Sequence, residues 1–210
     1  MKNTAPTLRR TLLNAALGAA LVMASAVLAT PNYAAAVEPH VENAGIFTTQ
    51  VPVEGSNIAT GRAVIVVDRP VDEVLPIVLD YANYVQFMPN FTKSKVLAQR
   101  GSRAMVYMEV SVARGMYTLY GQLNLAERPR DGVSRVVEGQ LVDGNIDAFD
   151  ASFTLTPTDD GTGTEIDFRI YVDPDLPLPS SVFSRENERA AGRAVRALRA
   201  RVAETLGGSA

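Results

Sequence analysis

The sequence contains no cysteine and no tryptophan, and it has a single histidine, His40. Without cysteine there is no disulfide, no thiolate nucleophile and no cysteine-ligated metal. With one histidine near the N-terminal end, we expect neither a Ser-His-Asp triad nor a histidine zinc site. A glycine-rich phosphate loop between a strand and a helix is also lacking, so we expect no cofactor and no metal. The hydrophobic core must therefore hold the folded chain together.

Acidic residues are missing from the first 36 positions, which contain three basic residues, Lys2, Arg9 and Arg10. An almost wholly apolar run follows at 12–28, and small residues at 34–36 suit a cleavage site, which is the pattern of a secretory signal peptide. We therefore expect cleavage near Ala36 and a periplasmic or secreted protein. Because an apolar run of about 17 residues is near the lower limit for a bilayer span, a retained membrane anchor is the alternative.

Loss of this segment would leave 174 residues and lower the net charge from −3 to −6, because the segment carries three bases and no acid. A chain of that length can bury one self-sufficient core. Nucleic-acid partners require a basic surface, so we expect none.

The first part of the predicted mature chain is mixed in pattern. Residues 37–56 contain prolines and glycines without a clear period, and we assign them to an N-terminal arm or linker. Residues 57–67 alternate and are rich in Val and Ile, which predicts a strand. Residues 71–79 repeat at helical spacing, with Pro76 limiting the helix, and a second short helix is predicted before Pro89.

From residue 92 to residue 172 the period changes to two, and glycine-containing turns separate six strand-like runs. Each run has one apolar and one polar face, which is typical of an antiparallel sheet covered on one side. The cover is a helix predicted from Ser180 or Ser181 to about Leu206, and residues 208–210 form a tail. The order predicts an α+β fold with a curved antiparallel sheet of about seven strands, two short helices after the first strand and a long C-terminal helix.

Several stretches of this order are similar to a known family. They are Arg69–Val74, Leu79–Tyr84, Phe87–Asn90, and Gly144–Leu155 leading into Gly163–Ile166. On these stretches the chain resembles the START-like superfamily of polyketide cyclases/dehydrases and lipid-transport proteins (SRPBCC, helix-grip), nearest to its coenzyme-Q-binding branch. The resemblance covers roughly residues 57–206 and makes 57–207 a START-like ligand-binding domain. Leu75, where many members have an aromatic residue, and the lack of tryptophan depart from the family pattern.

The resemblance implies a cavity between the sheet and the last helix that binds a hydrophobic small molecule such as a lipid, quinone, isoprenoid or polyketide. Alanines on the apolar face of that helix support a hollow, whereas close packing over Phe153 and Phe168 is the alternative. The residues that we expect to contact the ligand are Tyr81, Tyr84, Phe87, Met108, Val110, Tyr117, Leu119, Arg135, Val137, Phe153, Phe168, Ile170, Ala194 and Leu198. The aromatic residues are ordinary core residues in the alternative interpretation, and the polar tips of Tyr117 and Arg135 then bond other protein groups.

Two further functions stay open at this point. A cyclase- or dehydrase-like enzyme would use Tyr117, Arg135 or a carboxylate such as Glu138 as acid or base, although alternation puts Glu138 on the polar face. A partner-binding module would instead use the sheet edge or the polar face of the last helix. That face carries Arg185, Arg189, Arg193, Arg196 and Arg199, which are either solvated or suited to transient contact with an anionic membrane surface. We assign no catalytic residue.

Overall fold

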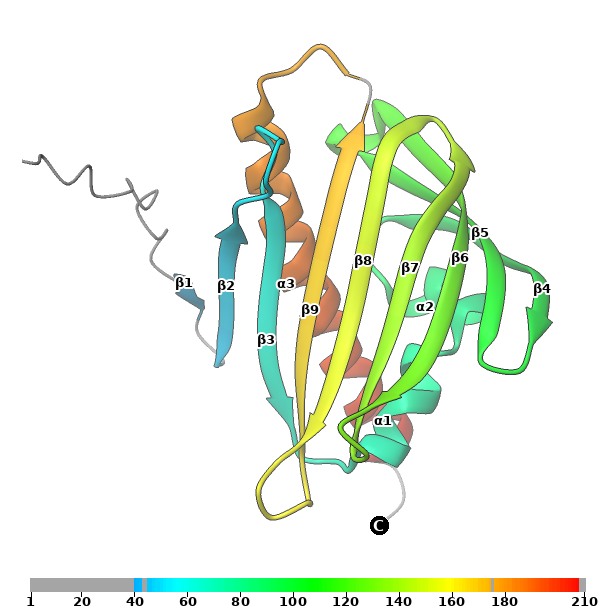
Figure 1. Ribbon diagram of the computed structural model, residues 1–210, viewed down its shortest axis with the longest axis vertical. Coiled ribbons are helices and arrows are strands. Elements are labelled where there is room, and N and C mark those ends of the chain that lie inside the picture. The colour runs from blue at the N-terminus through cyan, green and yellow to red at the C-terminus, as the bar shows by residue number, and fades with distance from the viewer. Residues whose placement is uncertain (1–39, 43–44, 175, 208–210) are drawn as a thin grey trace, which may run out of the picture. The chain divides into compact units, whose positions relative to one another are not determined.

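Figure 1 shows the protein as a computed structural model, which describes residues 40–42, 45–174 and 176–207. The predicted signal peptide at 1–36 and the tail at 208–210 lie outside the described residues. Within the described part of the chain, no helix is both long enough and apolar enough to cross a membrane.

The fold is built on one antiparallel sheet of nine described strands in the order β1-β2-β3-β9-β8-β7-β6-β5-β4. The strands are β1 (His40–Glu42), β2 (Ile46–Val51), β3 (Thr60–Val67), β4 (Phe91–Arg100), β5 (Arg103–Val112), β6 (Tyr117–Arg130), β7 (Ser134–Gly144), β8 (Ile146–Pro157) and β9 (Thr164–Pro174). The helices are α1 (Val71–Val78), α2 (Tyr84–Phe87) and α3 (Ser180–Leu206), with short 3-10 turns η1 (Tyr81–Asn83) and η2 (Ala113–Gly115). Each strand from β4 to β9 pairs with its chain neighbour, while β3 pairs with β9 and joins the two ends of the domain sequence.

The predicted α+β helix-grip architecture is confirmed, and the number of strands is corrected. The seven predicted strands are β3 to β9, and β1 and β2 come from the segment that we assigned to an arm. Ile46–Val51 pairs with β3 and buries Ile46 and Thr48, so the arm assignment is wrong for these residues. The segment is six residues long and mixes threonine and glutamine with apolar residues, which left its alternation too short to recognise.

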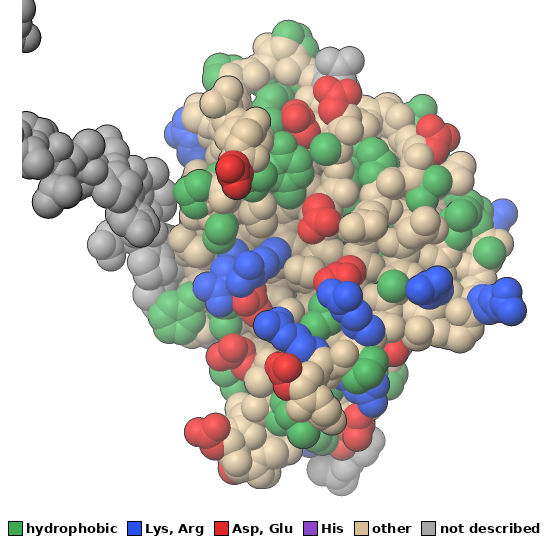
Figure 2. Space-filling model, viewed as in Figure 1, with side chains coloured by type: hydrophobic (Ala, Val, Ile, Leu, Met, Phe, Trp, Pro, Cys, Tyr) green, Lys and Arg blue, Asp and Glu red, His purple; other side chains and the backbone are tan. Residues whose placement is uncertain are grey.

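The outer face of the sheet is the polar one, as the alternation predicted. Figure 2 shows basic and acidic side chains interspersed on the face turned to the viewer. On this face Arg62 pairs with Asp167 at 2.9 Å, and Arg169 reaches the same carboxylate at 3.4 Å. The hydrogen bond that Arg62 donates to Asp167 is the main cause that raises the pKa of Arg62, with burial acting in the opposite direction. The alternation of apolar and polar residues along the strands therefore predicted the solvent-facing side of the sheet correctly.

The inner face is covered by α3, which packs over β2, β3 and β9 (Figure 1). Gly61 on β3 marks the closest approach, because a Cβ atom there would lie 2.1 Å from the backbone carbonyl of Asn187. Two side chains of β2 also bind α3, since Thr48 Oγ1 and Gln50 Nε2 donate to Glu188 at 3.1 and 2.8 Å. These contacts fix α3 over one half of the sheet.

The C-terminal half of α3 and the two short helices close one end of the interior. In α1 the buried residues Val71, Val74 and Val78 face inward, and the helix ends two residues after Pro76. The chain then continues through η1 and α2, which contact β4, and α1 and α2 both contact α3. Leu198 and Val202 of α3 are buried in this packed end. Among the described residues, no pair of short helices closes the opposite end of the interior in this way.

Candidate ligand-binding cavity

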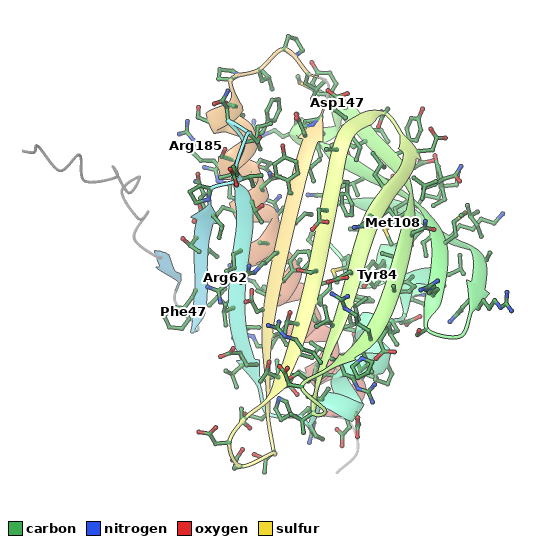
Figure 3. The ribbon with its side chains drawn as sticks, in the orientation of Figure 1. Phe47, Arg62, Tyr84, Met108, Asp147 and Arg185 are labelled. Atoms are coloured by element: carbon green, nitrogen blue, oxygen red, sulfur yellow. The ribbon has the colours of Figure 1, made fainter. Side chains whose placement is uncertain are left out.

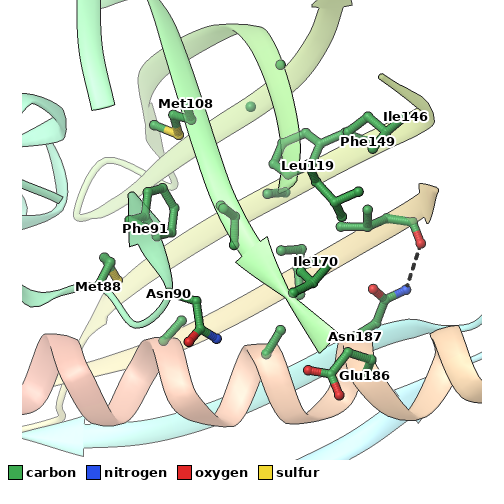
Figure 4. A pocket seen from close by; sticks show the side chains of 18 of the residues that line it. Met88, Asn90, Phe91, Met108, Leu119, Ile146, Phe149, Ile170, Glu186 and Asn187 are labelled. Atoms are coloured by element: carbon green, nitrogen blue, oxygen red, sulfur yellow. Dashed lines mark hydrogen bonds between the residues drawn. The ribbon is translucent and has the colours of Figure 1, made fainter. Parts of the chain in front are cut away.

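A cavity of about 420 Å³ lies between the inner face of β5 to β9 and the N-terminal half of α3 (Figure 4). This volume lies in the range of small-molecule binding sites, which is about 300–1,000 Å³. Most lining side chains are apolar, and they include Met88, Phe91, Met108, Val110, Leu119, Leu123, Leu125, Val137, Ile146, Phe149, Phe153, Phe168, Ile170, Val172, Ala190 and Ala194. The cavity is suited to an apolar molecule because burial of apolar surface is the main favourable contribution its walls offer.

The cavity exists because α3 covers only part of the sheet. The helix α3 packs over β2, β3 and β9, and α1 contacts β7 and β8 at the closed end of the domain. The remaining space in front of β5 to β8 is not covered by either helix and forms the cavity. On the flank of α3 that faces this space, Ala190 and Ala194 have side chains too short to cross it. Ala191, one position away, is fully buried against the sheet. Alanine thus lines the hollow at two positions and allows close packing at the third.

Eleven of the residues predicted from the sequence to contact a ligand line the cavity. They are Tyr81, Tyr84, Met108, Val110, Tyr117, Leu119, Val137, Phe153, Phe168, Ile170 and Ala194. Phe153 and Phe168 stack at 4.0 Å between ring centroids, but they form part of the cavity wall and do not close it. Figure 3 labels Tyr84 and Met108, which come to the cavity from α2 and β5.

The other three predicted residues, Phe87, Arg135 and Leu198, are not among the lining residues. Leu198 is fully buried in the packed end of the domain. The ring of Phe87 contacts the guanidinium of Arg201, 5.5 Å from the ring centroid. Arg135 pairs with Glu127 at 3.1 Å, so its charge is partnered by a protein group, and the proposed anchoring or acid–base role of Arg135 in the cavity is withdrawn.

An aromatic cluster forms one wall. The rings of Tyr81 and Phe91 meet that of Tyr84 edge-on, each with 5.7 Å between centroids. The hydroxyl of Tyr84 donates to the Val78 carbonyl at 2.6 Å and so ties α2 to the end of α1. Burial raises the pKa of Tyr84, and burial together with the Glu127 charge raises the pKa of Tyr81 to about 12. Both phenols are therefore neutral at physiological pH.

The opening of the cavity lies at the end away from α1. Several lining residues there are themselves exposed, namely Tyr117, Tyr120, Leu178 and Val182, with exposed fractions of 40–48%. They come from the start of β6, from the loop before α3 and from the first turn of α3. Asn145 holds the neighbouring turn by bonds to the Thr118 carbonyl and the Tyr120 amide. The entrance thus has an apolar rim.

Few polar side chains line the interior of the cavity, and the most buried of them is Asn187. This residue is 4% exposed, and its Nδ2 donates to the carbonyls of Ala59 at 3.1 Å and Val172 at 3.3 Å (Figure 4). The preceding residue, Glu186, accepts a hydrogen bond from Arg193 at 2.5 Å. Among the described residues no group of three His, Asp or Glu is placed to hold a metal.

Sequence reasoning missed Asn187 and the residues of the rim. Asn187 lies four positions before Ala191 and thus on the predicted apolar face of α3, so a polar residue there was the available signal. The apolar residues of the 176–182 segment fall where prolines break any periodic pattern, and the sequence contains no local signal for them. Phe149 also lines the cavity, although it was not among the residues predicted to contact the ligand. It was on the predicted apolar face of its strand, and alternation alone does not distinguish inward residues at the cavity from inward residues in the core.

Comparisons with known proteins agree with this geometry. The model of the family described as polyketide cyclase/dehydrase and lipid transport matches residues 67–199. A STAR-related lipid transfer protein from Xanthomonas axonopodis is 17% identical, with 80% of this chain and 98% of that chain covered and a TM-score of 0.71. Human STARD10 is 12% identical with a TM-score of 0.69, covering 82% of this chain and 75% of its own.

An enzyme of known structure has the same fold. The Zhui aromatase/cyclase from Streptomyces sp. R1128 is 14% identical, with a TM-score of 0.52 and coverage of 72% of this chain and 98% of that chain. No curated protein matches the sequence. At these identities the solved structures establish the fold, and the family model establishes which family has it.

Proposed function

Because this chain belongs to the polyketide cyclase/dehydrase and lipid transport family, we propose that it is an exported carrier that encloses an apolar small molecule beside α3. The single observation behind this proposal is the apolar cavity of about 420 Å³ with an apolar rim at its open end. The proposed ligand classes are lipids, isoprenoids, polyketides and quinones. Similarity to the coenzyme-Q-binding branch stays a prediction from the sequence.

Binding would be driven by removal of apolar ligand surface from water. At about 25 cal/mol per Å², each 100 Å² that the walls cover contributes roughly 2.5 kcal/mol before the cost of immobilising the ligand is subtracted. A few polar groups in the wall would then set the orientation of the ligand. This mechanism requires no chemical step and suits a protein that takes up and releases its ligand unchanged.

Export is the second part of the proposal. It rests on the basic, apolar and small-residue order of residues 1–36, which lie outside the described residues. Transient contact with an anionic membrane surface through the arginines of α3 also stays a prediction. Two of these arginines, Arg189 and Arg193, share the carboxylate of Glu186, which lowers the charge they offer to a membrane.

The carrier proposal is tested by recovering the ligand. The full-length chain is produced in its own host, purified without detergent and measured by native mass spectrometry, and the bound material is extracted with solvent and identified. We expect a mass increment from one small hydrophobic compound. Repeated recovery of empty protein that takes up none of a fluorescent fatty-acyl probe, a long-chain alcohol and a quinone would overturn the proposal.

A matched pair of variants shows whether the compound occupies this cavity. Ala194→Phe fills the hollow from α3 and should lower the bound fraction by about tenfold or more. Ala200→Phe makes the same change at an exposed position of the same helix and should leave the bound fraction unchanged. Equal retention in both variants would place the ligand elsewhere. If the recovered compound is chemically altered on incubation, the enzyme alternative replaces the carrier.

A further inference from the structure

The amide of Asn187 is held in one orientation by the backbone. Its nitrogen faces the carbonyl oxygens of Ala59 on one side and Val172 on the other, at 3.1 and 3.3 Å. A carbonyl oxygen only accepts hydrogen bonds, so the NH₂ group must face these two oxygens and both of its hydrogens are used. The two bonds thus fix the position of the remaining polar atom, the oxygen Oδ1.

That oxygen faces the cavity without a partner. Both hydrogen bonds described for the Asn187 side chain are donated by Nδ2. No fully enclosed side-chain nitrogen or oxygen of the described residues lacks a partner, so Oδ1, which accepts no bond among them, must keep some accessible surface. Because Asn187 lines the cavity and is only 4% exposed, the surface that Oδ1 retains is turned toward the hollow. Figure 4 shows the side chain on the cavity side of α3, with its nitrogen directed to the Val172 carbonyl.

The neighbouring lining group is also an acceptor, and its charge is neutralised. Glu186 lies one position earlier on α3, lines the same cavity, and pairs with Arg193 at 2.5 Å and with Arg189 at 3.9 Å. A carboxylate has lone pairs to spare after one such bond. Arg193, a cation of the cavity wall, is already paired with Glu186. A ligand carboxylate would therefore meet only hydrogen-bond acceptors on Glu186 and on Oδ1 of Asn187.

From this arrangement we infer that the cavity selects an uncharged ligand that carries a hydrogen-bond donor, in particular a hydroxyl group, placed against Asn187. The inference rests on the proposed function and narrows its ligand class. A ligand that fills the cavity displaces the water that serves Oδ1, and a ligand without a donor leaves a buried acceptor unpaired. Alcohols and phenols supply the donor, whereas an oxidised quinone and a fatty-acid anion offer acceptors alone.

The other polar groups near the cavity do not impose the same choice. Asn90, Tyr117 and Tyr120 are exposed, so water can serve them whether or not a ligand is bound. A tyrosine hydroxyl and an amide both donate and accept, and either kind of ligand group can satisfy them. The choice between ligands with and without a hydrogen-bond donor therefore depends on Oδ1 of Asn187, which is buried and can only accept.

The inference is tested with two ligands of which one has a phenolic hydroxyl and the other has the same oxygen capped by a methyl group. Binding of 4-dodecylphenol and 4-dodecylanisole to the full-length protein, freed of endogenous ligand, is measured by titration calorimetry at pH 7. We expect the phenol to bind about 3- to 10-fold more tightly, which is the worth of one neutral hydrogen bond. Equal or weaker binding of the phenol would overturn the inference and leave the carrier proposal standing. If neither compound binds, the inference fails, and the recovery of endogenous ligand alone decides the carrier proposal.

Two variants then locate the selecting group. Asn187→Leu removes the acceptor and should bring the affinities for phenol and anisole within about twofold of each other. Ser184→Ala is the matched control, because Ser184 lies one turn earlier, accepts from the Ala59 amide at 2.9 Å and does not line the cavity. Thermal melts of both variants report the loss of their bonds from α3 to the backbone of Ala59 and, for Asn187, of Val172. Preference for the phenol should persist in Ser184→Ala, and its persistence in Asn187→Leu would overturn the role of Asn187.

Discussion

Ala191 and Ala194 lie three positions apart on α3, yet the first is sealed against the sheet and the second faces the cavity. On the sealed flank the helix approaches β3 so closely that Gly61 has no room for a Cβ atom. On the open flank the strands β5 to β8 curve away, and short side chains leave the space free. One helix therefore forms a packed interface and roofs a hollow at the same time.

The hollow therefore depends on the packed flank of α3. The position of α3 over β2 and β3 is set by the missing side chain of Gly61 and by the bonds from Thr48 and Gln50 to Glu188. A helix displaced toward the middle of the sheet would fill the cavity. The binding volume is thus maintained by contacts of α3 with β2 and β3 on the flank opposite the cavity.

The largest expected effect comes from Gly61→Ala. Its new methyl group would lie 2.1 Å from the backbone of Asn187, so α3 must move away from β3. We expect a loss of at least about 3 kcal/mol in the free energy of unfolding, at the upper end for overpacking because both sides are backbone. Urea denaturation followed by circular dichroism measures the loss.

Gly192→Ala is the control for this prediction. Its methyl group would lie 3.1 Å from Cγ2 of Thr48, a contact that a shift of a few tenths of an ångström relieves, and the helix gains about 1 kcal/mol in propensity. We expect a net change within about 1 kcal/mol of zero. A Gly61→Ala protein as stable as the wild type would show that α3 does not rest on β3 as closely as described.

A second pair of variants compares the two flanks directly. Ala191→Leu overpacks the sealed flank and should cost about 1–3 kcal/mol of stability, with the cavity retained. Ala194→Leu makes the same change in the hollow, where we expect less than about 0.5 kcal/mol and a clear loss of ligand binding. Unfolding curves and the bound fraction of endogenous ligand are measured on both. Similar stabilities for the two variants would contradict the contrast between the flanks.

Much of the fold and of the cavity lining could be predicted from the sequence. The alternation between residues 92 and 172 correctly gave the strands and their wet face, and the periodicity after Ser180 gave α3 to its last residue, Leu206. Both patterns report which side of an element faces inward, and this information is local. The family resemblance implied a cavity between the sheet and the last helix, and the inward-facing positions then identified eleven of its lining residues.

The remaining part is set by contacts between distant segments. Periodicity places Ala194 and Leu198 on one inward stripe of α3, but only the position of α1 and α2 makes Leu198 a core residue and leaves Ala194 at the cavity. Arg135 faces inward as predicted, and its partner Glu127 is eight residues away on another strand. The short edge strand β2 was missed because its pairing with β3 is what makes it a strand.

The smallest of these effects is a dependence of stability on alkaline pH, which originates in the aromatic wall. Burial and the Glu127 charge raise the pKa of Tyr81 from 10.0 to about 12, so between these values the folded state binds more protons than the unfolded state. Its contribution is therefore intact below pH 10 and is lost as the pH rises, by about 1.4 kcal/mol at pH 11. Tyr84 adds to the loss in the same direction. Urea unfolding at pH 9, 10 and 11 measures the slope, and Tyr81→Phe should make it shallower because that variant has no proton to lose. An unchanged slope in Tyr81→Phe would mean that the Tyr81 hydroxyl is solvated, and the wall would then be open to water at that point.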